Sequence, residues 1–571
     1  MKHIFTLISA LVFVSCCFAQ PFERFRQNQS YDHLSLIKEY QKLDEQFEEA
    51  KLISIGKSDM GKDLHVFLIN ADKNFNFKEI SKGEKTVVLI NNAIHPGEPC
   101  GVDASLKLSW QLLSEKSKWS KDLVIAIIPM YNVGGGLNRA CCSRANQNGP
   151  EEAGFRGNAR NLDLNRDFIK ADAKNTWAFQ SLYQAIDPDV FVDTHTSNGA
   201  DYPYIMTLIA TQHNKLHPML GSYQKKYFEP GLYMKMNKKG YDLSPYVHTL
   251  NSVPDSGIFE YLETPRYSTG YTAQFHSFGF VTEAHMLKSF EERVLSNYHM
   301  LMSILEFSAE NGSKIQMLRN AARQNSNTQK LFPMQFELDK SESKELNFKG
   351  YAAKYKKSEI TGEDRLYYEP SEPYEKKIPF YDTYKAKKEI YTPYAYIIPQ
   401  VWSEVIKRLK HNGVQYFEFR SDTSFMAEVY YIEDYKTVKR PYEGHYLHYD
   451  VNLRKDTQLV KVYTGDILIP TYQNRKRFMV EVLEPEAADS YFAWNFFDEI
   501  LQQKEWYSAY VFEDRAVELL AKDPKLKADF EAKKKEDPDF AKDVRAQLSY
   551  IYKRSSYYEN SHLRYPVYRM H

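Results

Sequence analysis

A series of short apolar runs constrains the fold of residues 52–307 more than any other feature of the chain. The runs are LHVFLIN (64–70), TVVLINNAI (86–94), DLVIAIIPM (122–130), DVFVDTH (189–195) and FGFVTEAHM (278–286). They resemble buried strands more than half-exposed ones. A stretch from about 100 to 113 between them has helical spacing. Strands separated by helices predict an α/β fold with a sheet covered on both faces.

The length of 571 residues exceeds what one hydrophobic core usually holds, so two domains are expected. Beyond about residue 331, short aromatic and β-branched segments predict strands: YAYIIP (394–399), VQYFEF (414–419), AEVYYI (427–432), QLVKVY (458–463) and RFMVEVLE (477–484). From about residue 494 the sequence becomes helical and charged. We therefore predict an N-terminal domain (20–310), a helical linker (311–330) and a C-terminal accessory domain (331–571), β-rich and then helical.

The N-terminus has the features of a secretory signal. A short basic start precedes an apolar run at 4–14, which is followed by SCCFAQ. We predict a signal peptide at residues 1–19, cleavage after Ala19 and a secreted or periplasmic protein beginning at Gln20. A lipoprotein cut before Cys16 is the alternative. The run is too short to span a bilayer, and no later segment has the pattern of a transmembrane helix.

Charge and cysteine content exclude few functions. Lys plus Arg and Asp plus Glu both number 75, so charge gives no argument for a nucleic-acid partner. Removal of the signal would leave Cys100, Cys141 and Cys142, an odd number. A bridge from Cys100 to one of the adjacent pair and free thiols remain equally open. The sequence does not indicate the oligomeric state.

Polar residues gather where the predicted strands end. One strand is followed by His95 and Glu98, another ends at His195, and the last carries Glu283. In open α/β sheets, side chains beyond the carboxyl ends of strands converge on a ligand. A catalytic zinc takes three His or carboxylate ligands and leaves a position for water. His95, Glu98 and His195 would supply that set for one Zn²⁺ per chain.

The segment GNARNLDLNRDF (157–168) precedes the strand that ends at His195. Asp163 could hold a metal-binding imidazole in place without itself contacting the metal. Asn165 and Arg166 could bind a carboxylate, since a guanidinium matches its geometry with two parallel hydrogen bonds. The segment therefore predicts a carboxylate-binding loop beside the metal.

Four elements in this order, namely HPGE, the Asn-Arg of DLNRDF, Asp-Thr-His and a late-strand Glu, resemble the zinc carboxypeptidases of the M14 (carboxypeptidase A-like) type. The resemblance covers about residues 30–310. It implies an α/β/α sandwich around a mixed sheet. It also implies a carboxypeptidase acting on the C-termini of peptides or proteins.

The resemblance also implies roles for single residues. It makes His95, Glu98 and His195 the zinc ligands, Asn165 and Arg166 the binders of the substrate carboxylate, and Glu283 the general base. Arg144, with Arg139 behind it, would polarise the scissile carbonyl. The NVGG turn (132–135) departs from the family's Asn-Pro-Asp-Gly, which loosens that alignment. The tyrosine covering the substrate is to be chosen among Tyr261, Tyr267 and Tyr271, with Tyr271 preferred.

Other interpretations of these residues remain. His285 shares a strand face with Glu283 and competes as a ligand. Glu283 could instead pair with Arg293, and Arg156 and Arg160 have the character of solvated loop charges. At the level of function, the alternatives are an amidase or deacylase acting on cell-wall peptides, and an inactive binding protein on the same scaffold.

Overall fold

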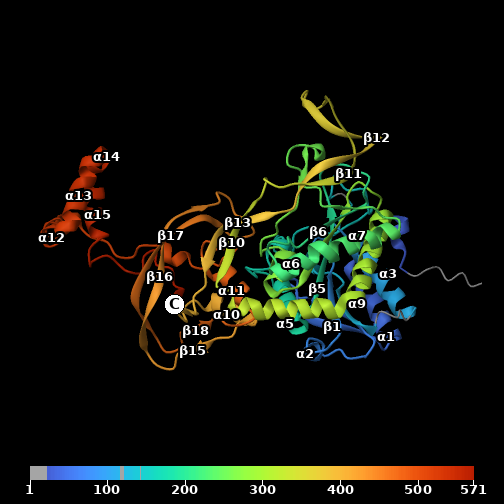
Figure 1. Ribbon diagram of the computed structural model, residues 1–571, viewed down its shortest axis with the longest axis horizontal. Helices are drawn as coiled ribbons and strands as arrows, with labels where there is room; N and C mark the ends of the chain where they lie inside the picture. Colours follow the sequence, from blue (N-terminus) through green and yellow to red (C-terminus); the bar gives the residue numbers. More distant parts are fainter. Residues whose placement is uncertain (1–21, 116–120, 142) are drawn as a thin grey trace, which may run out of the picture.

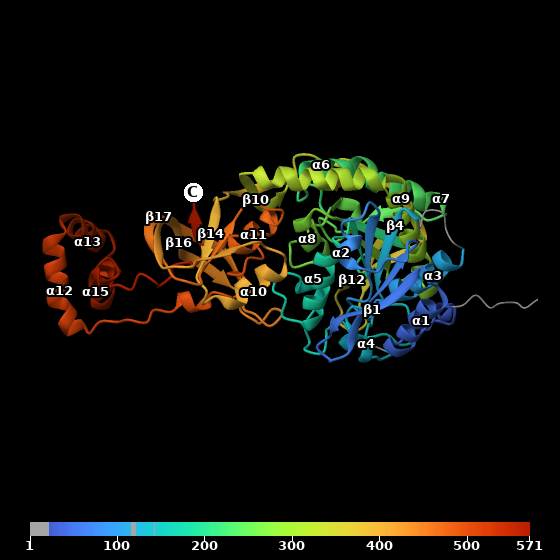
Figure 2. The ribbon, with the colours of Figure 1, turned by 90° about the horizontal axis from the view of Figure 1, so that it is seen from below.

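The computed structural model describes residues 22–115, 121–141 and 143–571. The predicted signal segment, with Cys16 and the cleavage position, lies outside the described residues. Figures 1 and 2 show an N-terminal α/β domain, a central β domain and an outlying group of helices, arranged along the long axis of the molecule. Among the described residues, no helix has both the length and the apolar character needed to cross a bilayer.

The N-terminal domain is built on an eight-stranded sheet in the order β1-β2-β4-β3-β5-β9-β6-β7. Its strands are β1 Ala50–Lys57, β2 Asp63–Asn70, β3 Thr86–Asn91, β4 Leu123–Ile128, β5 Val190–Ser197, β6 Met206–Ala210, β7 Leu243–Pro245 and β9 Phe278–His285. Strands β4, β3, β5 and β9 are parallel, whereas β1, β2 and β6 introduce antiparallel pairs. The mixed sheet confirms the predicted fold class.

Helices cover both faces of this sheet, which explains the apolar runs. Val88 and Ile90 of β3 pack in the core beneath α1 His33–Gln46, α3 Cys100–Ser114 and α9 Phe290–Thr328, together with α6 Pro218–Tyr223 and α7 Glu229–Lys238. Val87 and Leu89 point to the other face, beneath α5 Lys174–Ile186 and α8 Ser268–Thr272. Short helices α2 Phe77–Ile80 and α4 Val133–Leu137 complete the domain.

Helix α9 corrects the predicted linker. It is one continuous helix of 39 residues that begins at a capping box formed by Ser289 and Glu292. Its second half is polar, but Ile315, Leu318 and Ala322 form an apolar stripe that packs into the N-terminal core. Because this stripe is buried, residues 311–328 belong to the first domain and carry the chain towards the second (Figure 1).

The central domain contains a six-stranded sheet in the order β15-β18-β14-β19-β16-β17. Its strands are β14 Ala395–Ile398, β15 Phe417–Glu418, β16 Thr423–Thr437, β17 His448–Val462, β18 Ile467–Pro470 and β19 Tyr568–Met570. Helices α10 Ser403–His411 and α11 Lys476–Leu483 lie beside it. One continuous hydrophobic core joins this domain to the α5 face of the first sheet.

Helix α11 overturns the strand predicted at 477–484. Every residue of this helix is buried, so the sequence lacks the exposed face that would reveal helical periodicity. Arg477 and Glu481, one turn apart, form an ion pair of 2.9 Å that fits only the helix.

Two further parts extend from these domains. A long hairpin, β11 Lys344–Lys357 and β12 Asp364–Tyr381, was not predicted; its base pairs in parallel with β8 Ile258–Phe259. Strands β10 Leu331–Leu338 and β13 Tyr384–Tyr391 form a separate pair. Helices α12 Ala509–Lys522, α13 Pro524–Glu536, α14 Pro538–Lys542 and α15 Val544–Tyr552 have a small core of their own (Figure 2).

Candidate active site

The loop after β3 delivers the first two predicted ligands. His95 and Glu98 are buried in the loop that joins β3 to α3. Gly97 lies between them because a Cβ there would come within 2.4 Å of Nε of Arg144. The glycine of the HPGE motif therefore makes room for a guanidinium beside Glu98.

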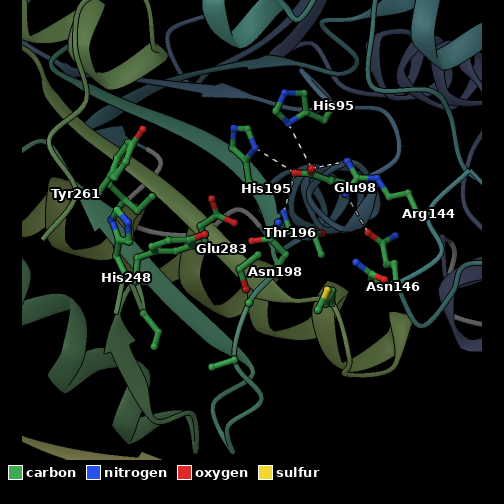
Figure 3. A pocket seen from close by; sticks show the side chains of 18 of the residues that line it. His95, Glu98, Arg144, Asn146, His195, Thr196, Asn198, His248, Tyr261 and Glu283 are labelled. Carbon is green, nitrogen blue, oxygen red and sulfur yellow. Dashed lines mark hydrogen bonds and ion pairs between the residues drawn. The ribbon is translucent and has the colours of Figure 1, made fainter. Parts of the chain in front are cut away.

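His95, Glu98 and His195 meet at one point (Figure 3). One ligand atom from each lies within 4.8 Å of the others, and all three side chains are buried. His95 Nδ1 is 3.3 Å from Glu98 Oε1, and His195 Nδ1 is 3.1 Å from Glu98 Oε2. Among the described residues His95 Nδ1 has no hydrogen-bond partner. Two imidazoles and a carboxylate, with a buried nitrogen left free, suit a zinc ion with an open position.

Each ligand histidine has an aspartate beside its far nitrogen, as a hydrogen bond at His95 and as an ion-pair contact at His195. His95 Nε2 lies 2.8 Å from Asp163 Oδ1, and His195 Nε2 lies 3.3 Å from Asp193 Oδ2. Such partners fix the ring so that Nδ1 faces the metal position. Asp163 was predicted for this place, and Asp193 was not. Asp193 could have been found, because residues two apart on a strand share a face.

Arg156 is a second residue that the sequence did not identify. It was predicted to be a solvated loop charge, but its Nη2 pairs with Asp163 Oδ2 at 2.9 Å and its Nη1 lies 3.6 Å from Glu98 Oε1. Burial alone would raise the pKa of Asp163; His95, Arg156 and Arg166 instead hold it well below its usual range. The carboxylate is therefore ionised.

The charges of the cluster stabilise one another. Burial would raise the pKa of Glu98, but Arg144 and the two imidazoles hold it well below the usual range. Burial would lower the pKa of His195, but Asp193 and Glu98 raise it. Thr196 also donates its backbone N–H to Glu98 Oε2 at 2.9 Å. Glu98 is thus fixed in position as an anion.

Glu283 faces the same cavity. It is paired in register with His195 across β5 and β9 and points towards the ligands (Figure 3). Within the described chain its Oε2 is buried without a hydrogen-bond partner. The pKa of Glu283 is raised to about 8, chiefly by burial. The nearby carboxylates also raise it, whereas the charge of His195 lowers it. Such a group can take up and release a proton near neutral pH.

The rival interpretations of this strand do not hold. Arg293 donates to the carbonyl oxygens of Asn148 and Gly149, so it is not the partner of Glu283. His285 lies 3.2 Å from Asp201 and stacks on Tyr202, outside the ligand cluster.

The ligands open onto a cavity of about 910 Å³. Asn165 and Arg166 line it, as predicted from their place beside Asp163. The Arg166 guanidinium lies 4.4 Å from the centre of the Tyr267 ring, and its Nη1 donates to the Asn165 carbonyl at 2.9 Å. The guanidinium is therefore held in place from two sides and remains partly open to the cavity, with 21% of the side chain exposed.

The choice of Tyr271 was wrong. Tyr271 is fully buried in the core shared by the two domains, and its hydroxyl donates to Asn412 Oδ1 at 2.7 Å. Tyr261 and Tyr267 line the cavity instead, and the Tyr261 hydroxyl donates to that of Tyr267 at 3.2 Å. The sequence alone could not show that Tyr271, on the short helix α8, faces the core.

The two arginine candidates have different surroundings. Arg144 lines the cavity and donates to Glu98 Oε1 (Figure 3). Arg139 donates to the carbonyl oxygens of Tyr31 and Glu152, away from the ligands. The preference for Arg144 over Arg139 therefore fits the geometry.

Cys100 is a buried free thiol and Cys141 is in a disulfide. The bridge considered between Cys100 and one of the two adjacent cysteines is therefore not formed.

Comparison with known proteins gives a consistent assignment. Residues 36–273 match the family model of the zinc carboxypeptidases, peptidase M14. Carboxypeptidase 2 of Trichophyton equinum is 23% identical over 465 residues, covering 76% of this chain and 78% of the relative. The protein of the same name from Trichophyton tonsurans is 24% identical over 465 residues, again covering 76% of this chain and 78% of the relative.

Similar solved structures include a metallo-carboxypeptidase from Pseudomonas aeruginosa, with a TM-score of 0.36, 13% identity and coverage of 50% of this chain and 68% of that one. Another is the carboxypeptidase A of Helicoverpa armigera, with a TM-score of 0.34, 13% identity and coverage of 50% and 74%. The family match spans the predicted ligands and the carboxylate-binding loop. The family match over residues 36–273 and the two relatives, both named carboxypeptidases, thus support a zinc metallocarboxypeptidase as the class of this protein.

Proposed function

We propose that the protein is a zinc-dependent carboxypeptidase that removes residues from free peptide C-termini, with Glu283 as its general base. One observation carries the proposal: Arg166, fixed by Tyr267 and by the Asn165 carbonyl, lines the same cavity as His95, Glu98 and His195. A fixed guanidinium suits a planar carboxylate. A terminal carboxylate held there brings the last peptide bond towards the metal ligands.

The residues of the cavity divide the chemistry among them. Zinc held by His95, Glu98 and His195 would polarise the carbonyl and lower the pKa of water. Glu283 takes the proton of the attacking water and passes it to the leaving amine nitrogen. Arg144, on the cavity wall, stabilises the negative charge that develops on the carbonyl oxygen.

The supports of these groups reduce the motion needed during reaction. Asp163 and Asp193 keep the two imidazoles turned inward, while Arg156 neutralises part of their charge. Tyr261, at the cavity wall beside Tyr267, is placed to cover the bound substrate in the role first assigned to Tyr271.

The proposal includes export. We expect removal of residues 1–19, a mature chain beginning at Gln20 and a secreted or periplasmic location. N-terminal sequencing and mass measurement of the exported protein test this. A lipid-modified Cys16 would contradict it.

A comparison of two peptides tests the activity. A peptide with a free C-terminus should be cleaved at least a hundredfold faster than its C-terminal amide, because the amide leaves Arg166 without its partner. Arg166→Ala should shrink that ratio. Equal cleavage of both peptides by the unmodified enzyme would exclude recognition of a terminus and favour an amidase, such as one acting on cell-wall peptides.

A further inference from the structure

A tight turn of the central domain contacts the carboxylate-binding loop of the N-terminal domain. Tyr442 and His445 pair as an isolated bridge, with hydrogen bonds of 2.7 and 3.0 Å between their backbones. The two residues between them, Glu443 and Gly444, have φ of 52° and 82°. The positive φ of both residues fits a type I′ turn, which usually avoids a residue such as glutamate at its first central position. Backbone of this kind persists where surrounding contacts hold it.

The Glu443 side chain makes the contact. Its Oε2 accepts a hydrogen bond of 2.7 Å from the backbone nitrogen of Asp163, 280 residues away in the sequence. Asp163 is the residue whose Oδ1 lies against His95 and accepts from the backbone nitrogen of Asn165. A bond from the central domain therefore helps to hold the residue that orients one ligand and lies within the carboxylate-binding loop.

The segment just after this loop is held from the same domain. His445, the last residue of the turn, lies 2.7 Å from Asp172 Oδ2. Arg408 of α10 donates to the carbonyl oxygen of Lys170 at 2.6 Å and to that of Ala171 at 3.3 Å. Residues 163–172 are thus anchored at both ends.

The second support of Arg166 is anchored as well. Asp489, in the segment after α11, accepts from the backbone nitrogen of Arg266 at 2.9 Å and from its Nε at 2.7 Å. The Arg266 guanidinium also lies 5.0 Å from the Trp494 ring and 5.5 Å from that of Tyr442. Arg266 precedes Tyr267, whose ring lies against Arg166.

We propose that the central domain completes the substrate-binding site, and that Glu443 is a positioning residue for the carboxylate-binding loop. Both the loop with Asn165 and Arg166 and the segment with Tyr267 are fixed by side chains from this domain. The inference rests on the proposed function, since it assigns these residues to the substrate carboxylate. It makes the second domain part of the active site instead of an independent module.

Two variants of the full-length chain test the role of Glu443. Glu443→Ala removes the acceptor, whereas Glu443→Gln keeps a carbonyl oxygen in its place. We expect Glu443→Ala to raise KM for a free-acid peptide about tenfold with a smaller change in kcat, and to reduce the preference for free acid over amide. Glu443→Gln should restore most of both. Glu433→Ala, at an exposed glutamate of β16 paired only loosely with Arg454, is the matched control.

The outcomes separate this inference from the proposed function. If the unmodified enzyme does not prefer the free acid, the proposed function fails. If it does, and Glu443→Ala keeps the KM and the preference of the unmodified enzyme, the positioning role is overturned. Equal losses on acid and amide, with a lowered melting temperature and no rescue by Glu443→Gln, would also overturn it, because they would show a structural role only.

Discussion

His195 and Glu283 stand opposite each other on the neighbouring parallel strands β5 and β9. This register places a predicted ligand and the predicted base side by side although they are far apart in the sequence. Both residues line the cavity, and apart from Glu283 itself every residue of the two strands is buried. The sheet therefore sets the separation between this ligand and the base, which favours a rigid site.

Replacing the base should separate chemistry from folding. Glu283→Gln keeps the shape of the side chain and removes its ability to take a proton, so kcat should fall by a factor of roughly 10² to 10⁴. Zinc content and melting temperature should stay close to those of the unmodified protein. Steady-state kinetics and metal analysis measure these values, and near-normal turnover would place the base elsewhere.

Metal binding should depend on the ligands and their outer partners. His95→Ala and His195→Ala should lose zinc, while Asp163→Asn and Asp193→Asn should weaken it about 10- to 100-fold. Competition with a chelator gives these affinities. His285→Gln is the control, since this buried histidine lies outside the cluster and should leave zinc binding unchanged. Full metal retention in both ligand variants would exclude the site.

The two tyrosines should respond differently to loss of a hydroxyl. Tyr261→Phe should raise KM for peptides with little effect on unfolding, because Tyr261 lines the cavity. Tyr271→Phe should leave KM unchanged and reduce the free energy of unfolding by about 1 kcal/mol, since it removes a buried hydrogen bond to Asn412. Kinetics and denaturant unfolding of both variants check this, and the reverse pattern would restore Tyr271 as the covering residue.

A buried carboxylate in the cavity should affect the choice of substrate side chain. Glu263 lines the cavity, and one of its oxygens accepts from Thr269 while the other has no hydrogen-bond partner among the described residues. A carboxylate in this setting favours a cation nearby. Peptides ending in Lys or Arg should therefore lose more in kcat/KM on Glu263→Gln than peptides ending in Leu. An equal loss in kcat/KM for all of these peptides would mean that Glu263 only stabilises α8.

Glu260, which does not line the active-site cavity, should make stability depend on pH. Burial and then the nearby Asp382 raise the pKa of Glu260 to about 8, whereas in the unfolded chain it lies near 4.5. The stability that this group contributes is complete below pH 4.5 and is lost as pH rises through 8. Glu260→Gln should thus be more stable than the unmodified protein at pH 8.5, by on the order of 1 kcal/mol or more. Urea unfolding of both proteins at pH 5 and pH 8.5 checks this. The prediction would be contradicted if the difference in free energy of unfolding between variant and unmodified protein were the same at both pH values.

The sequence predicted well those parts of the fold that are buried on two faces. The runs that became β3, β4, β5 and β9 are apolar because helices cover both sides, and His95, Glu98, His195 and Glu283 follow from their ends. Their order in the sequence, together with the carboxylate-binding loop, carried the family resemblance, which then assigned their roles.

The predictions from the sequence failed where tertiary contacts determine the local structure or the direction of a side chain. Helix α11 is buried all round and therefore lacks helical periodicity. Tyr271 lies on α8 with its side chain in the core, whereas Tyr261 lies in the segment after β8 and lines the cavity. Arg156 contacts Glu98 and Glu443 bonds to Asp163, residues that are remote from them in the sequence. Such contacts leave no local signal, so a single sequence could not reveal them.

Strand β19 has a consequence for biosynthesis. Residues 568–570 pair with both β14 and β16 in the interior of the six-stranded sheet, whereas helices α12–α15 form a side excursion before it. During translation the catalytic residues leave the ribosome long before the sheet can close. The six-stranded sheet, whose strand β16 precedes the turn with Glu443, is complete only when residue 570 has emerged. On the role proposed for Glu443, the substrate-binding site is therefore completed after the rest of the catalytic domain has been made.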